Sequence, residues 1–428
     1  MEIKYLIKGG KKLKGEIEIE GAKNAALPIL ASTILLNEKV ILENIPDVED
    51  VNTMLSLLET LGARIKKIDE NRFEVDPEGI NSWEAPYEAV RKMRASIYVL
   101  GPLLARFGKA KVAFPGGCSF GPRPINYHIE GLAKMGAEIE IDKGFIIAKC
   151  KKLKGEELYF DQKSVGATAH LAMASIFAKG KTVILNASKE PEVVDLLNFL
   201  KKCGAKIKGE GEDIVEIEGV KKLSPPLKYK IIDDRIEAGT FLVAARMTKG
   251  EIKIKSKCGK YLENVIEKLK ESGAEIEVQK ESIYLNGKND ILPLKIETAP
   301  YPGFPTDLQP QFVSMLSIAK GTSIINEGIY PERFGYTGEL MRMGANIKVE
   351  KGICIIEGIK KLKGTHLIAP DIRAGAALVI AALSAEGESI VEGIEHIKRG
   401  YKNFHEKLKK LGANINLINV SRETLSNF

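Results

Sequence analysis

The chain has 428 residues, of which 44% are hydrophobic and 28% are charged, and its formal net charge is +7. A chain this long and this apolar can bury two or three cores, and its nearly balanced charges exclude disorder as the main state. The modest excess of cations favours anionic small molecules as ligands over a nucleic-acid coat.

Arginine is scarce in this basic chain. Only 13 of the 64 Lys and Arg residues are Arg. A guanidinium offers a rigid, bidentate fork that the Lys ammonium lacks, so each Arg marks a position where such a fork is useful.

The cysteines, histidines and aromatic residues give no sign of a disulfide, a metal site or a base-stacking platform. The five cysteines never form a CxxC motif, the five histidines do not cluster, and Trp83 is the lone tryptophan. This pattern predicts a reducing compartment and no metal or other cofactor.

The ends and the apolar runs predict a cytoplasmic protein. Residues 1–8 alternate polar and apolar side chains like a strand, so we expect no signal peptide. The longest apolar run, 374–383, is shorter than the roughly 18 to 20 residues that a membrane span requires. We therefore expect no membrane association.

An internal repeat is the strongest structural signal. A pentad of the form x-Gly-Ala-x-Ile occurs six times, with its glycine at Gly62, Gly136, Gly204, Gly273, Gly344 and Gly412. A second marker, Lys-Lys-Leu-Lys-Gly, begins at Lys11, Lys151 and Lys360, and a partial copy begins at Lys221. The two markers share one period, so the sequence predicts six units of about seventy residues.

Each unit is predicted to contain two kinds of helix among short strands. Amphipathic helices are expected over 55–61, 129–135, 193–203 and 262–272, each ended by the pentad glycine in a left-handed conformation. The second kind of helix is apolar on all sides, as in segments 168–174, 240–245 and 376–382, and is therefore predicted to be buried. Across the six units, these helices are expected to end at Asn37, Gly108, Gly180, Gly250, Gly321 and Gly387. Such helices favour closed α/β domains over an open solenoid.

The segments that enter the buried helices place a charged residue beside a small one. They are 21–24, 92–96, 163–167, 234–239, 305–307 and 371–375. Helix N-termini hold phosphates and carboxylates, so several of them together would form a polyanion site. The alternative is that Asp and Ser are ordinary N-caps and Arg a surface residue.

One irregular loop interrupts the repeat. Residues 114–124 contain three Gly and three Pro, with Cys118 at the centre and Arg123 nearby. A loop cysteine near a cation is a candidate for a reactive thiol, although most lone cysteines are inert core residues.

These motifs resemble one family of enzymes over about residues 3–418. The chain resembles the UDP-N-acetylglucosamine 1-carboxyvinyltransferases in Gly-Ala-Lys-Asn-Ala-Ala at 21–26, Lys-Met-Arg-Ala-Ser at 92–96, Pro-Gly-Gly-Cys at 115–118 with Arg123-Pro124, Ser-Val-Gly-Ala-Thr at 164–168, Phe-Pro-Thr-Asp at 304–307 and Asp-Ile-Arg-Ala at 371–374. The cysteine loop is specific within the enolpyruvyl transferases.

The resemblance implies an α/β fold of two inside-out, barrel-like domains. Each would hold three βαβαββ units, and a double-crossing hinge would join them. One domain would comprise residues 1–22 and 231–428, and the other 23–230, with the active site in the cleft between them.

The resemblance also implies the reaction and the site. The enzyme would transfer enolpyruvyl from phosphoenolpyruvate to the 3-hydroxyl of UDP-N-acetylglucosamine and release phosphate, the first committed step of peptidoglycan synthesis. Cys118 would be the general acid and Asp307 the base, and Lys23, Asn24, Arg123 and Arg399 would hold phosphoenolpyruvate. The nucleotide sugar would contact Arg94, Arg123, Pro124, Ile125, Asn126, Tyr127, Lys163, Ser164, Val165 and Ile329, and Arg333, Asp371 and Arg373 would support the cleft.

The sequence departs from the family at one position and leaves two other functions open. Some family members carry Lys two positions before Ser164, where this chain has Gln162 with Lys163 beside it, and either could face the diphosphate. We expect a monomer with small-molecule substrates and no nucleic-acid partner. The alternatives are a 3-phosphoshikimate 1-carboxyvinyltransferase and a nucleotide-sugar sensor without catalysis.

Overall fold

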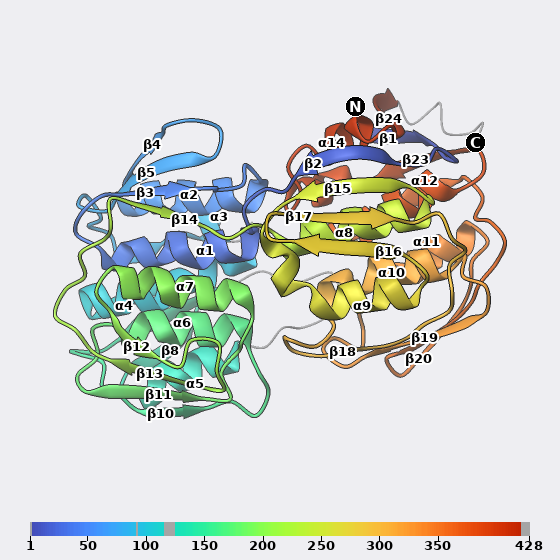
Figure 1. The fold of residues 1–428 in the computed structure, drawn as a ribbon. Coiled ribbons are helices and arrows are strands. Elements are labelled where there is room, and N and C mark those ends of the chain that lie inside the picture. The colour runs from blue at the N-terminus through green and yellow to red at the C-terminus, as the bar shows by residue number, and fades with distance from the viewer. Residues whose placement is uncertain (1, 91–92, 115–124, 421–428) are drawn as a thin grey trace. The chain divides into compact units, whose positions relative to one another are not determined.

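The computed structural model describes residues 2–90, 93–114 and 125–420, which fold into two compact units (Figure 1). Unit 1 contains the described residues of 2–20 and 233–420, and unit 2 those of 21–232. Each unit has its own apolar core and three four-stranded sheets. The predicted α/β class is confirmed.

Unit 2 contains three similar groups of elements, each with one sheet. The first has β14 (Lys228–Lys230), β3 (Val40–Glu43), β5 (Arg72–Asp76) and β4 (Arg64–Lys67), with α1 (Lys23–Ser32), η1 (Thr33–Leu35) and α2 (Glu49–Leu61). The second has β6 (Glu84–Ala85), β7 (Lys109–Ala113), β9 (Phe145–Lys149) and β8 (Glu138–Asp142), with α3 (Tyr87–Val90), η2 (Arg94–Val99), α4 (Leu100–Phe107) and α5 (Asn126–Lys134). The third has β10 (Glu157–Tyr159), β11 (Lys181–Leu185), β13 (Ile214–Glu218) and β12 (Lys206–Lys208), with α6 (Val165–Ser175) and α7 (Pro191–Lys202).

Unit 1 repeats the same plan. Its first group has β2 (Lys14–Glu18), β15 (Glu251–Lys255), β17 (Ser282–Asn286) and β16 (Glu275–Gln279), with α8 (Arg235–Met247), η3 (Cys258–Tyr261) and α9 (Glu263–Glu271). The second has β18 (Lys295–Thr298), β19 (Thr322–Glu327), β21 (Ile353–Glu357) and β20 (Asn346–Glu350), with η4 (Thr306–Leu308), α10 (Gln309–Leu316) and α11 (Thr337–Arg342). The third has β22 (His366–Ile368), β23 (Glu388–Glu392), β1 (Glu2–Lys8) and β24 (Asn414–Val420), with α12 (Ile372–Ser384), α13 (Ile394–Lys398) and α14 (Phe404–Lys410).

The six sheets share one strand pattern, which the N-terminal strands complete. In each sheet the first two strands are parallel and the remaining pairs are antiparallel. β2 is the first strand of one sheet of unit 1, and β1 is the third strand of another. The chain therefore begins by supplying strands to two sheets whose other strands come more than two hundred residues later.

The all-apolar helices lie inside and the sheets lie outside, as the sequence predicts. Nearly every residue of α6, α8 and α12 is buried, whereas strands such as β15 alternate exposed and buried side chains. Figure 1 shows the helices of each unit lying between its sheets. The period of two along the strands puts Lys and Glu in solvent and Ile and Val against the helices.

The pentad glycines follow the amphipathic helices in the predicted left-handed conformation, with φ between 91° and 110°. Gly250 differs from the prediction, because Lys249 has the positive φ of 53° at the end of α8. A Cβ on Gly250 would lie 2.2 Å from the carbonyl oxygen of Leu13. Close approach of two chain segments, and not a helix cap, therefore explains this glycine.

The Lys-Lys-Leu-Lys marker also has a structural explanation. The leucine of each marker is buried, whereas the lysines of the marker are exposed. These leucines are Leu13, Leu153, Leu223 and Leu362. Each marker lies just before the first strand of a sheet. The leucine closes the core at the junction between two repeat units, so the marker recurs with the repeat.

Within the ranges that the structure describes, no helix is both long and apolar enough to cross a membrane. The same residues contain no cluster of three His, Cys, Asp or Glu side chains that could hold a metal ion.

Two glycine substitutions separate the cost of conformation from the cost of crowding. Gly204 has a φ of 96°, and no heavy atom lies within 4 Å of the place that a Cβ would take, so Gly204→Ala should lower the free energy of unfolding by about 1–2 kcal/mol through the left-handed conformation alone. A Cβ on Gly219 would lie 1.7 Å from the carbonyl oxygen of Ala178, so Gly219→Ala should cost more. Chemical denaturation of both variants measures this order, and equal losses would contradict it.

Candidate active site

A half-buried carboxylate lies between two buried guanidinium groups in unit 1. Asp307 is in η4, Arg333 is in the turn before α11, and Arg373 is in the first turn of α12. Nη1 of Arg333 donates to Oδ1 of Asp307 at 2.8 Å, and Nε and Nη2 of Arg373 lie 3.3 and 3.2 Å from Oδ2. The structure thus brings together three residues that are separated by up to 66 positions in the chain.

Pairing with Asp307 is what makes the burial of both arginines tolerable. Arg333 is 3% exposed and Arg373 is 4% exposed. Burial by itself would lower the pKa of each guanidinium, but Asp307 at Arg333, and Tyr401 together with Asp307 at Arg373, outweigh that effect and raise it. Both groups therefore carry a permanent positive charge beside the carboxylate.

Asp371 and Tyr401 fix the position of Arg373, whose Nη1 remains available as a hydrogen-bond donor. The side chain of Asp371 caps α12 by accepting hydrogen bonds from the N–H groups of Arg373 and Ala374, at 2.8 and 3.0 Å. The guanidinium of Arg373 lies over the Tyr401 ring, 5.3 Å from its centroid. Its buried Nη1 has no hydrogen-bond partner among the described residues, so it could donate to an anionic ligand.

A buried glutamate fixes the segments on either side of this cluster. Glu327, at the end of β19, is 2% exposed. Its Oε1 accepts hydrogen bonds from Thr298 Oγ1 at 2.6 Å and from the N–H groups of Ile329 and Tyr330 at 3.0 Å. Its Oε2 accepts from Thr306 Oγ1 at 3.0 Å. One carboxylate therefore holds both the residue before Asp307 and the loop that carries Ile329.

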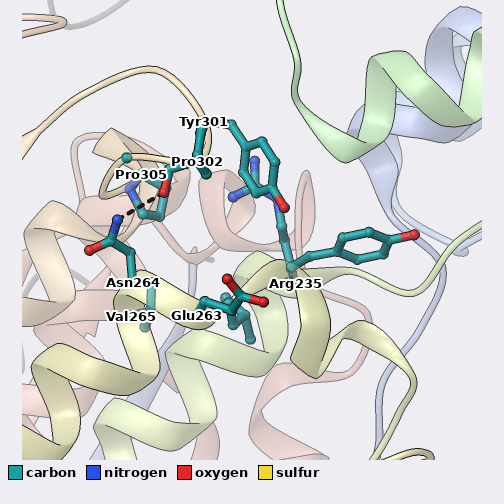
Figure 2. Close-up of a pocket in the computed structure, with 10 residues that line it drawn as sticks. Arg235, Glu263, Asn264, Val265, Tyr301, Pro302 and Pro305 are labelled. Carbon is teal, nitrogen blue, oxygen red and sulfur yellow. Dashed lines mark hydrogen bonds between the residues drawn. The ribbon is translucent and has the colours of Figure 1, made fainter. Parts of the chain in front are cut away.

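A shallow pocket adjoins the turn that carries Asp307 (Figure 2). Pro305 forms part of its wall, and the guanidinium of Arg235 lies 5.5 Å from the centroid of the Tyr301 ring. Nδ2 of Asn264 donates to the carbonyl oxygen of Pro302 at 2.9 Å, which is the dashed line in Figure 2. Arg235 is the first residue of α8, one position earlier in its helix than Arg373 is in α12, and it likewise lies against an aromatic ring.

In unit 2, the predicted substrate lysine is a buried residue with an acidic partner. Lys23 is the first residue of α1 and is 7% exposed, and its Nζ lies 2.9 Å from Oδ2 of Asp50 in α2. The N-cap of α1 is Ala22, which provides no side-chain hydrogen bond. The N–H groups of the first turn therefore have no side-chain cap and could bind an anion together with Lys23.

A second group in unit 2 lies at the start of α6. The hydroxyl of Tyr127 accepts a hydrogen bond from the N–H of Gln162 at 3.1 Å, and Ser164 caps α6 by accepting from the N–H of Ala167 at 3.2 Å. Nζ of Lys163 donates to the carbonyl oxygen of Ala187 at 3.0 Å and forms an ion pair with Asp213. The structure thus ties Tyr127 to Gln162, the residue just before the predicted residues 163–165.

The other predicted site residues fall into three groups. Asn24, Asn126 and Val165 are exposed, and Ile125 is buried as the N-cap of α5. Arg94 begins η2, and Arg399 is the C-cap of α13. Cys118, Arg123 and Pro124 lie outside the described residues.

The sequence leaves two explanations for the repeated helix starts, N-capping and anion binding, and the structure separates the starts into two sets. Ser164, Asp234 and Asp371 cap their own helices, so ordinary N-capping accounts for these three residues. The starts at Lys23, Arg94 and Thr306 have no side-chain cap. The N–H groups at the uncapped helix starts are therefore available to an anion. At the capped starts, the Ser or Asp side chain competes with an anion for the same N–H groups.

Sequence reasoning missed the residues that hold the predicted ones in place. Asp50 follows Glu49 at the start of a helix, which is a common surface pattern, and Glu327 ends a strand like many other acidic residues of this chain. Only the tertiary contacts distinguish them. Tyr401 carries a weak signal, since an aromatic residue follows Arg399 and Gly400.

The fold is that of the enolpyruvyl transferases. The structure matches that of the enolpyruvyl transferase NikO from Streptomyces tendae with a TM-score of 0.90 and 23% sequence identity, covering 98% of this chain and 100% of the other. It matches an EPSP synthase from Acinetobacter baumannii with a TM-score of 0.77 and 18% identity, again covering 98% of this chain and 100% of the other.

Sequence comparisons narrow this class to a family. The family model of EPSP synthase (3-phosphoshikimate 1-carboxyvinyltransferase) matches residues 7–408. UDP-N-acetylglucosamine 1-carboxyvinyltransferase 1 of Carboxydothermus hydrogenoformans is 50% identical over 97% of this chain and 98% of its own, and the enzyme of Thermodesulfovibrio yellowstonii is 49% identical over 97% and 99%. The chain therefore belongs to the EPSP synthase family and, within it, to the UDP-N-acetylglucosamine 1-carboxyvinyltransferases, as its motifs predict.

The role of Glu327 in the cluster can be tested by stability. Glu327→Ala leaves two N–H groups and two hydroxyls without their acceptor and should lower the free energy of unfolding by about 3 kcal/mol. Glu327→Gln keeps an acceptor at the Oε1 position and should cost only about 1 kcal/mol. Denaturant titration compares the two variants, and an equal loss in both would contradict this account.

Proposed function

We propose that this chain transfers the enolpyruvyl group of phosphoenolpyruvate to the 3-hydroxyl of UDP-N-acetylglucosamine and releases phosphate, the first committed step of peptidoglycan synthesis. The observation that carries the proposal is the near-full-length identity of about 50% to enzymes that are named for this substrate. Two EPSP synthase structures from Acinetobacter baumannii match at 18% identity.

The reaction is an addition followed by an elimination. A proton adds to the methylene carbon of phosphoenolpyruvate while the sugar 3-hydroxyl bonds to the adjacent carbon and loses its proton to a base. Loss of a proton from the new methyl group then expels phosphate and restores the double bond. The enzyme must therefore supply one acid, one base and cations for the phosphate and the carboxylate.

Asp307 is suited to the role of base. Arg333 fixes Oδ1 of its carboxylate and Arg373 fixes Oδ2, so the side chain is held in one orientation. The side chain is 27% exposed, so one side of it is open to a ligand. The uncommitted Nη1 of Arg373 could bind a substrate oxygen beside the base.

The remaining roles are assigned by motif. Cys118 would be the general acid and could also form a covalent adduct with phosphoenolpyruvate. Lys23, Asn24, Arg123 and Arg399 would hold phosphoenolpyruvate, and the nucleotide sugar would contact Arg94, residues 123–127, residues 163–165 and Ile329. These residues come from both units.

We further propose a cytoplasmic monomer that needs no cofactor. The absence of a CxxC motif is typical of a reducing compartment, and the reaction as written needs no redox partner. Sedimentation velocity at several protein concentrations tests the monomer, and a dimer at all concentrations would contradict it.

A phosphate-release assay with two acceptors tests the function. Phosphoenolpyruvate with UDP-N-acetylglucosamine should release phosphate, and phosphoenolpyruvate with shikimate 3-phosphate should not. Release with the second acceptor alone would make the chain a shikimate-pathway enzyme. Binding of UDP-N-acetylglucosamine by calorimetry, without any release of phosphate, would identify a sensor.

The reactive cysteine can be found by chemical labelling. Cys203, Cys258 and Cys354 are buried, and burial raises the pKa of each thiol to about 12, so none of them should be a thiolate near neutral pH. We expect the epoxide fosfomycin to alkylate Cys118 and no other cysteine, with loss of activity. Cys118→Ala should be inactive and unlabelled. Peptide mapping by mass spectrometry that finds the adduct elsewhere would refute Cys118 as the acid.

A further inference from the structure

Asp195, on the buried face of α7, is a carboxylate outside the proposed catalytic and substrate-binding residues. It is 5% exposed, and burial raises its pKa to about 6, with the neighbouring Glu192 acting in the same direction. Hydrogen bonds from Tyr229 and Ile232 and the charge of Lys202 oppose that rise. A buried carboxylate lowers the stability of the fold unless its hydrogen bonds compensate for the loss of solvation. The groups that Asp195 holds therefore indicate its role.

The hydrogen bonds of Asp195 hold the backbone just before the start of unit 1. Oδ2 accepts from the N–H of Ile232 at 3.2 Å, and Oδ1 accepts from the hydroxyl of Tyr229 at 2.7 Å. Nδ2 of Asn44 donates to the carbonyl oxygen of Ile231 at 3.0 Å. Residues 231 and 232 are therefore fixed on both sides by side chains of unit 2.

That fixed segment in turn holds the start of α1. The carbonyl oxygen of Ile232 accepts a hydrogen bond from the N–H of Ala22 at 2.7 Å. Ala22 is the N-cap of α1, and Lys23 is the first residue of the helix. One continuous path of two hydrogen bonds thus leads from Asp195 through Ile232 to the residue that precedes Lys23.

Little room exists for the start of α1 to move by itself. A Cβ on Gly21 would lie 1.7 Å from the carbonyl oxygen of Asn44. The N–H of Ile231 also donates to the carbonyl oxygen of Glu43 at 3.0 Å. Residues 21–22, 43–44 and 231–232 therefore pack backbone against backbone, and Asp195 is the one carboxylate among the described residues seen to bind the N–H of Ile232.

We infer that Asp195 is a positioning residue for phosphoenolpyruvate binding, acting through Ile232 and Ala22 on Lys23. The inference rests on the proposed function, in which Lys23 binds the phosphoenolpyruvate anion. A misplaced ammonium weakens the grip on that substrate, while the groups that bind UDP-N-acetylglucosamine keep their positions. The expected signature is a change in KM that affects only one of the two substrates.

Steady-state kinetics with both substrates test the inference. Asp195→Ala should raise KM for phosphoenolpyruvate about tenfold, with kcat and KM for UDP-N-acetylglucosamine within about twofold of wild type. Asp195→Asn keeps an acceptor for the N–H of Ile232 but loses the charge, so the same KM should rise about threefold. Tyr229→Phe is the matched control, because it removes the other hydrogen bond of Asp195 and leaves the one to Ile232. It should lower thermal stability and leave KM for phosphoenolpyruvate unchanged.

Each outcome decides the matter. Wild-type KM for phosphoenolpyruvate in folded Asp195→Ala would overturn the inference, as would equal rises in both KM values. If Asp195→Ala fails to fold, Asp195→Asn decides, and a wild-type KM in that variant overturns the inference. A wild-type protein that transfers no enolpyruvyl at all would refute the proposed function instead.

Discussion

The burial of two guanidinium groups beside one carboxylate is the constraint on which the proposed chemistry depends. A buried charge is costly unless it is paired, and removal of one partner leaves the other exposed to the full desolvation penalty. Arg333 and Arg373 therefore require Asp307, and Asp307 cannot leave them without cost. The same surroundings that stabilise the folded unit thus hold a carboxylate in one place, which is what a general base needs.

The surrounding residues extend this constraint into the fold. Asp371 fixes the backbone of Arg373 as a helix cap, and Glu327 fixes both Thr306 and the loop of Ile329. These anchors lie at the ends of elements whose middles are closed apolar core, where no polar group could be accommodated without a partner. Unit 2 uses the same device at Lys23, with Asp50 at the side chain and Asp195 acting through the backbone. In both units, buried or half-buried carboxylates hold the positive groups in position.

The sequence is sufficient for the repeat, the helix types and the motif residues, because each of these is a local pattern. The six pentad glycines required a left-handed residue, and Gly204 and its counterparts have one. The partners could not be predicted, since Asp50 and Glu327 look like surface acids until distant segments meet. The local pattern also predicts a helix cap at Gly250, and this prediction is wrong. Glycine is required there because the backbone at Leu13 leaves no room for a Cβ. The cap role of Ser164 and Asp371 was one of two open explanations, and only geometry could choose between them.

The most direct test of Asp307 as the general base compares product formation from labelled phosphoenolpyruvate in the wild type and in Asp307→Asn. Wild-type protein is incubated with UDP-N-acetylglucosamine and phosphoenolpyruvate labelled with carbon-13 at the methylene carbon, and NMR follows the vinyl ether on the sugar 3-oxygen. We predict that this product forms with wild type and forms at least about 100-fold more slowly with Asp307→Asn, because general base catalysis contributes a factor of that size. The same rate in both proteins, or no labelled vinyl ether with wild type, would contradict the account.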